Sequence, residues 1–185
     1  MNRTFALKSP QVCLRAHYGL TGSMSEYRAP AGLGVGHVHL KVSDLERSEV
    51  FYRDVIGLEV TQRYGSQALF MSAGGYHHHV GLNTWMSRGG RPPAEGATGL
   101  FHVAFLYPTR ADLARAVKQV LACGVELEGA ADHGVSHAVY LRDPDQNGIE
   151  LYWDLPRSEW PVDAHDGLEM VTEPLDLVGL LAEAR

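Results

Sequence analysis

The sequence predicts an α+β fold built from two tandem βαβββ repeats, and three observations support this. Segments with alternating apolar and polar residues are typical of strands with one buried face. In each half of the chain, such a segment precedes a helical pattern that starts at a capping residue and ends at a glycine. The interval from His37 to the helix-ending Gly57 is 20 residues. In the second half, the interval from His102 to Gly124 is 22, which indicates duplication.

The first repeat opens with a strand at residues 36–42, where apolar and polar side chains occupy opposite faces. Asp44 is the predicted N-cap of a helix that runs to residue 56, and Gly57 is its stop. A segment rich in Gly and Pro at residues 88–93 links the two halves. Between the helix and this link, short strands are predicted at residues 59–64, 68–72 and 77–84.

The second repeat follows the same order of elements. Its leading strand at residues 101–106 carries His102 near its start. Thr109 and Asp112 form a capping box, and the helix that follows ends at Gly124. The remaining strands are predicted at residues 125–127, 138–142 and 149–154.

The domain boundaries follow from these patterns. The residues before the first strand show no periodicity, so we expect an arm that is disordered or not native, with Met24 as an alternative start. Near the C-terminus, an apolar stripe follows a first helical turn at Pro174, which favours packing on the body over a lid. The predicted parts are an arm at residues 1–33, a domain at 34–154 with repeats at 34–86 and 99–154, and an extension at 155–185.

The composition is that of a folded soluble protein. The chain has 185 residues, of which 45% are hydrophobic and 21% charged, and this excludes a disordered or collagen-like class. The formal net charge of -6 argues against nucleic acid or an anionic membrane as a partner. No apolar stretch approaches the roughly 18 residues of a membrane span, and no secretory signal is recognised, so we expect a cytoplasmic protein.

Histidine is the residue in excess, with 10 in all and eight between His37 and His137. One histidine opens the leading strand of each repeat, and Glu150 lies on the last strand. Two imidazoles and one carboxylate are the ligand set of a non-haem Fe(II) site that keeps adjacent positions open. The same groups also bind Mn or Zn, so this pattern alone leaves the metal open.

Further motifs make a family resemblance specific. The run at residues 76–85, with its three histidines, resembles single-module extradiol dioxygenases. Four features resemble the active-site strand pair of extradiol catechol 2,3-dioxygenases: His-Gly-Val-Ser-His at 133–137, Tyr140, Asp-Pro at 143–144 and Glu150. Together with the duplicated pattern, residues 34–154 resemble the vicinal oxygen chelate superfamily, which includes glyoxalase I and bleomycin-resistance proteins. The resemblance implies a curved mixed sheet that forms a cup around a metal site.

The resemblance also assigns roles to individual residues. Tyr140 matches the tyrosine that hydrogen-bonds the substrate's metal-bound oxygen, and His133 matches the histidine that donates to the oxygen intermediate. His78 is the best match to the base of the distal pocket, with His77 and His79 as alternatives. The implied metal ligands are His37, His102 and Glu150.

The function implied by the resemblance is an Fe(II)-dependent extradiol dioxygenase, with Mn(II) as the alternative metal. It would act on catechol-type diols with O2, and single modules of this kind pair, so we expect a homodimer. A glyoxalase-type lyase needs a fourth ligand, a Glu, but residues 60–94 contain no Asp or Glu, and Gly81 stands near the expected position. A bleomycin-resistance-like binding protein stays open as a further alternative.

Overall fold

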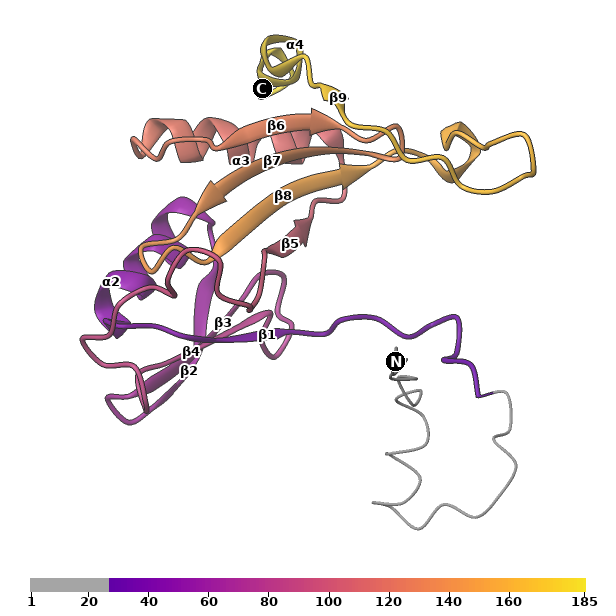
Figure 1. The fold of residues 1–185 in the computed structure, drawn as a ribbon. Helices are drawn as coiled ribbons and strands as arrows, with labels where there is room; N and C mark the ends of the chain where they lie inside the picture. Colours follow the sequence, from indigo (N-terminus) through magenta and orange to yellow (C-terminus); the bar gives the residue numbers. More distant parts are fainter. Residues whose placement is uncertain (1–26) are drawn as a thin grey trace, which may run out of the picture. The chain divides into compact units, whose positions relative to one another are not determined.

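The structure is a computed structural model that describes residues 27–185 (Figure 1). Residues Gly36–Arg185 form one compact unit, which holds every helix and strand described below. Most of the predicted arm, including Met24, lies outside the described residues. No helix in the described part of the chain combines the length and the apolar character needed to cross a membrane.

The first repeat forms a mixed four-stranded sheet in the order β1-β4-β3-β2, with β1 parallel to β4. The predicted strands match β2 and β3, whereas the strand predicted at 77–84 is shorter because pairing with β3 begins only at Val80. The elements are β1 (Val38–Lys41), α2 (Leu45–Val50), the π-helical turn η1 (Phe51–Val55), β2 (Glu59–Tyr64), β3 (Ala68–Ser72) and β4 (Val80–Asn83).

Local chemistry explains where the first helical segment starts and ends. The Asp44 carboxylate accepts a hydrogen bond from the Arg47 backbone N–H over 3.0 Å, as expected for an N-cap. Gly57 ends the segment at a φ of 87°, a conformation that costs glycine little. The last turn is a π-helix, in which the Ile56 N–H donates to the Phe51 carbonyl five residues back.

The second repeat forms a mixed five-stranded sheet in the order β5-β8-β7-β6-β9, so the prediction of an α+β fold with two βαβββ-like modules is confirmed. Thr109 caps α3 by accepting from the Asp112 N–H over 3.1 Å, as predicted. The elements are β5 (Val103–Leu106), α3 (Arg110–Ala122), β6 (Gly129–Asp132), β7 (Ser136–Arg142), β8 (Gly148–Asp154), the short 3-10 helix η2 (Arg157–Glu159), β9 (Glu173–Pro174) and α4 (Leu177–Ala182).

Two predicted elements of this half were wrong. The strand predicted at 125–127 starts later, because β6 pairs with β7 only from Gly129, which lies opposite Tyr140. Pro174 does not belong to a first helical turn. It pairs with β6 as part of β9, an edge strand, where a residue without an N–H is tolerated. The helix begins after Asp176, whose carboxylate accepts from the Gly179 N–H over 2.9 Å.

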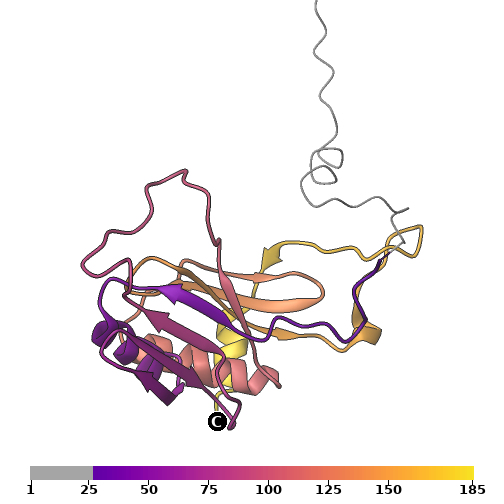
Figure 2. The ribbon, with the colours of Figure 1, turned by 90° about the horizontal axis from the view of Figure 1, so that it is seen from below.

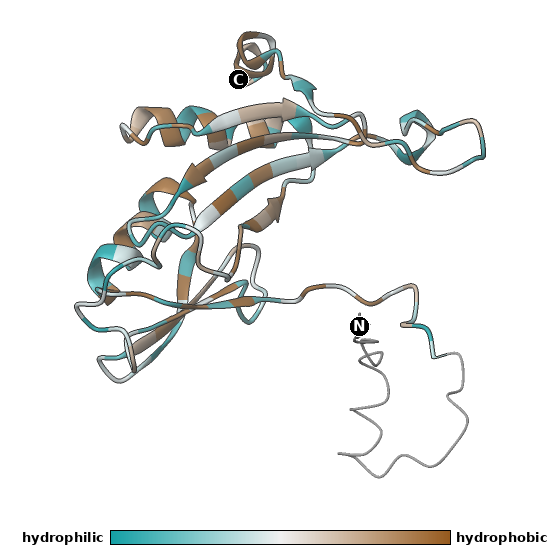
Figure 3. Cartoon of the chain, in the orientation of Figure 1, coloured by the Kyte–Doolittle hydropathy of each residue, from teal (hydrophilic) through white to brown (hydrophobic). Residues whose placement is uncertain are grey.

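The hydrophobic core runs through both repeats. Helix α3 packs on β8, and α4 packs on α3 through the fully buried Leu180 (Figures 1 and 2). Apolar and polar residues alternate along β7 and β8 in the hydropathy view (Figure 3). Buried apolar residues of β7 and β8, such as Leu141 and Ile149, therefore face the helix side, whereas the opposite face carries polar side chains.

Candidate active site

The polar face of the second sheet brings together residues from four strands. Because side chains alternate along each strand, paired residues in a cross-strand row point to the same face. His102 lies two residues before Ala104 and so shares that face. The row, read from β5 to β6, consists of Ala104, Glu150, Tyr140 and Gly129.

Four of the predicted site residues make a continuous chain of contacts. His102 Nε2 lies 2.9 Å from Glu150 Oε2. The Tyr140 hydroxyl lies 3.3 Å from Glu150 Oε1 and 2.7 Å from His133 Nε2. Burial of the phenol beside the Glu150 carboxylate raises the pKa of Tyr140 to about 12. The phenol therefore stays protonated at neutral pH.

Gly148 allows His102 to reach its partner. A Cβ atom at this position would overlap the Phe101 carbonyl oxygen and lie 3.1 Å from His102 Cα. Backbone cannot move aside as a flexible side chain can, so the close approach of these segments depends on glycine. In a sequence, a glycine in a strand is one signal of such a close approach between backbone segments.

The donors of His102 and Glu150 fit a metal ion. An imidazole nitrogen and a carboxylate oxygen that converge to 2.9 Å are two of the ligands a non-haem metal takes. His102 Nδ1 is buried and has no hydrogen-bond partner, which leaves this imidazole incompletely satisfied. Within residues 27–185, however, no three His, Cys, Asp or Glu side chains meet closely enough to hold an ion.

His37 lies with the histidines of the first repeat. Its ring centroid is 4.4 Å from that of His78, and His77 Nδ1 is 2.7 Å from His78 Nδ1. His79 turns away to Ser72, whose hydroxyl is 3.0 Å from its Nδ1. Partial burial, and then the charge of His37, lowers the pKa of His78. The structure thus groups His37 with His78, and groups His102 with Glu150.

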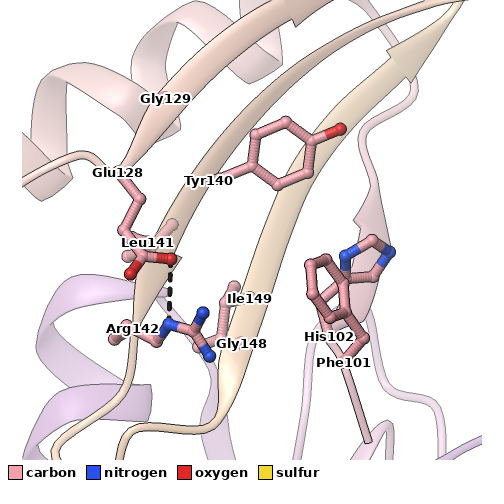
Figure 4. Close-up of a pocket in the computed structure, with 9 residues that line it drawn as sticks. All are labelled: Phe101, His102, Glu128, Gly129, Tyr140, Leu141, Arg142, Gly148 and Ile149. Carbon is pink, nitrogen blue, oxygen red and sulfur yellow. Dashed lines mark hydrogen bonds and ion pairs between the residues drawn. The ribbon is translucent and has the colours of Figure 1, made fainter. Parts of the chain in front are cut away.

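A cavity of about 300 Å³ opens beside His102 and Tyr140 (Figure 4). The exposed ring of Phe101 stands next to His102 at its edge. On the other side, Arg142 Nε donates to Glu128 Oε2 over 2.8 Å. Sequence reasoning missed this ion pair, because only the pairing of β6 with β7 brings the two residues together.

The comparisons with known proteins identify the family. Residues 34–151 match the model of the Glyoxalase/Bleomycin resistance protein/Dioxygenase superfamily, and the chain belongs to this family. The family resemblance predicted from the motifs is therefore confirmed.

Two of the relatives are named as diol or catechol dioxygenases. The chain is 40% identical over 150 residues to a catechol-2,3-dioxygenase of Bacillus subtilis (strain 168), which covers 81% of this chain and 52% of that protein. It is 34% identical over 144 residues to biphenyl-2,3-diol 1,2-dioxygenase 3 of Rhodococcus globerulus, covering 76% of this chain and 74% of that protein. The chain thus spans about half the length of the first relative and is a homologue of extradiol dioxygenases.

A solved structure shares the fold. A glyoxalase/dioxygenase from Nostoc punctiforme superposes with a TM-score of 0.58 at 21% identity, covering 72% of this chain and all of that one.

Proposed function

We propose that the protein is an Fe(II)-dependent extradiol dioxygenase that opens the ring of catechol-type diols with O2. The observation that carries the proposal is the contact chain from His102 through Glu150 and Tyr140 to His133. It sets an imidazole–carboxylate pair beside a phenol and a second imidazole, and a cavity opens next to it. Similarity to two diol dioxygenases supports the same assignment.

In this proposal the metal is held by His37, His102 and Glu150. When bound, Fe(II) would supply adjacent positions for the diol and O2 and would take up developing charge, and Mn(II) is the alternative. In the structure His37 lies beside His78 and forms no three-ligand group with His102 and Glu150. Binding of the metal ion would therefore have to draw His37 toward the His102–Glu150 pair. A homodimer and a cytoplasmic location belong to the proposal as well.

Three further side chains would handle protons and position the diol. The raised pKa of Tyr140 keeps its hydroxyl as a donor for a substrate oxygen. The lowered pKa of His78 keeps its imidazole neutral, and therefore able to accept a proton from the diol. His133 Nε2 lies next to the Tyr140 hydroxyl and would exchange a proton with the diol bound beside Tyr140.

The structure also offers an observation against a glyoxalase-type site. The fourth carboxylate ligand of such a site would be expected near Gly81 in β4. A Cβ atom at Gly81 would lie 3.0 Å from the ring of His39, so this space is already filled by the neighbouring strand. A ligand set with two carboxylates is therefore disfavoured.

The proposal is tested with protein purified without oxygen and analysed for metal. Catechol and 3-substituted catechols are then added with O2, and the yellow ring-opened product is followed by absorbance. We expect product from at least one diol, and none after the metal is removed by a chelator. Protein that holds one equivalent of Fe(II) and opens no catechol would contradict the assignment.

A further inference from the structure

The imidazole of His133 is held from two sides. On one side, Nε2 lies 2.7 Å from the Tyr140 hydroxyl. On the other side, Nδ1 lies 2.9 Å from the carbonyl oxygen of Val171 and 3.4 Å from Oγ1 of Thr172. The shorter contact is to the carbonyl, which belongs to the segment between β8 and β9.

These contacts determine where the proton of the neutral imidazole sits. A carbonyl oxygen can only accept a hydrogen bond, so Nδ1 of His133 has to be the donor in this contact. Neutral imidazole has one N–H, and Nε2 is then the acceptor. The Tyr140 phenol has one O–H and two neighbours that can accept it. Its contact to His133 Nε2, 2.7 Å, is shorter than its contact to Glu150 Oε1, 3.3 Å, so the hydroxyl donates to the Nε2 lone pair.

The carbonyl is itself held firmly. The Val171 N–H donates back to the His133 carbonyl over 3.1 Å, so the two residues bond in both directions. Gly134, at a φ of 73°, leaves room for the segment, because a Cβ there would lie 3.0 Å from Pro161 Cγ and 3.3 Å from Val171 Cγ2. Beyond Val171, β9 pairs with β6 and α4 packs on α3.

We propose that the C-terminal segment, through the Val171 carbonyl, is a positioning element that keeps His133 in its Nδ1–H tautomer. The segment lies beyond the residues matched by the family model, which end at 151. For catalysis the inference rests on the proposed function. A proton that the bound diol releases can then add only to Nε2, forming an N–H bond there and leaving the anion on the diol oxygen, while the Nδ1–H bond to Val171 is retained. His133 then donates from Nε2 only after that uptake, without turning its ring.

The direct test is 15N NMR of histidine-labelled, metal-free wild-type protein, at a pH where the imidazole is neutral. We expect His133 to show a protonated Nδ1 and an unprotonated Nε2. An Nε2–H tautomer would overturn the proposal. This readout needs no turnover, so a protein that shows the expected tautomer but opens no diol contradicts the proposed function alone.

Two variants distinguish the role of the Val171 carbonyl from that of the neighbouring Thr172 hydroxyl. Val171→Pro removes the N–H that anchors the carbonyl, and we expect mixed tautomers at His133. Its kcat should fall by roughly 10-fold or more, because a general acid or base typically contributes about 100- to 10,000-fold, with KM nearly unchanged. Thr172→Val removes only the hydroxyl and should leave both tautomer and kcat unchanged. If Thr172→Val shifts the tautomer, the Thr172 hydroxyl and not the Val171 carbonyl sets the tautomer of His133. If Val171→Pro does not fold, the wild-type spectrum decides.

Discussion

The Tyr52 hydroxyl donates a hydrogen bond to Asp143 Oδ2 over 3.0 Å, joining residues that lie 91 positions apart. Both groups are buried. Tyr52 comes from the first repeat, and Asp143 opens the turn that leads into β8. The same carboxylate accepts from the backbone N–H groups of Asp145 and Asn147 over 2.9 and 2.8 Å. The bond therefore ties the first repeat to the start of the strand that carries Glu150.

Tyr52→Phe should destabilise the fold, because it leaves the buried Asp143 carboxylate with one partner fewer. Hydrogen bonds to charged groups contribute about 1.5–3 kcal/mol, and we expect a loss of that order in the free energy of unfolding. Urea denaturation followed by tryptophan fluorescence measures it. Tyr64→Phe, at a tyrosine that is 65% exposed, is the control and should leave the midpoint unchanged. Equal midpoints for both variants would refute this role.

Stability should fall in alkali. Burial, and then the neighbouring Asp143 carboxylate, raises the pKa of Tyr52 well above its ordinary value. A group whose pKa is raised by folding contributes stability that is complete below its unfolded pKa, about 10 for tyrosine, and lost as the pH rises further. Burial also raises the pKa of Tyr107 and Tyr140 to about 12. Urea midpoints between about pH 9 and 11 should drop in wild type and less steeply in Tyr52→Phe. Parallel curves would be the contrary result.

Gly148→Ala should weaken metal binding by displacing the backbone of Phe101 and His102. Groups that orient a metal ligand typically change affinity by about 10- to 100-fold, and we expect a loss in that range. Anaerobic calorimetric titration with Fe(II) measures it, and circular dichroism checks the fold. Gly99→Ala is the matched control, because nothing lies within 4 Å of a Cβ at that position. A folded Gly148→Ala protein with wild-type affinity would show that this glycine does not position His102.

His37→Ala should abolish stoichiometric Fe(II) binding and leave the fold intact, because the side chain is exposed and its ring lies against the rings of His77 and His78. His39→Ala, two residues further along the chain, has no proposed metal role and serves as the control. Metal content and thermal midpoints with and without Fe(II) are compared. A ligand at about 100 times its Kd stabilises by about 2.7 kcal/mol, so the metal-dependent shift should vanish in His37→Ala alone. A retained shift would remove His37 from the ligand set.

Much of the fold was predictable because the signals are local. Asp44 and Thr109 cap their helices through their own side chains, and Gly57 and Gly124 adopt the positive φ that ends each helical segment. Strand alternation placed Tyr140 and Glu150 on strands, and their pairing brings them together on one face. These features depend on residues a few positions apart or on one sheet register.

Other features depend on contacts that cannot be predicted from the types of the residues involved. The bond from His133 to Val171 uses a backbone carbonyl, which every residue carries. Arg142 and Glu128 meet only through the pairing of β6 with β7, and β6 itself began later than its apolar residues suggested. Long-range backbone partners of this kind require the folded chain to be seen.

The pairing of Tyr140 with Glu150 constrains the length of the turn between β7 and β8. The two residues lie opposite each other on strands joined by the turn at residues 143–147. Adding or deleting one residue there would shift the strand by one position and point every later side chain to the opposite face. Glu150 would then turn toward α3 and away from His102. This turn is therefore intolerant of insertions, whereas the link at residues 88–93, which no strand pairing fixes, is where added sequence can be accommodated.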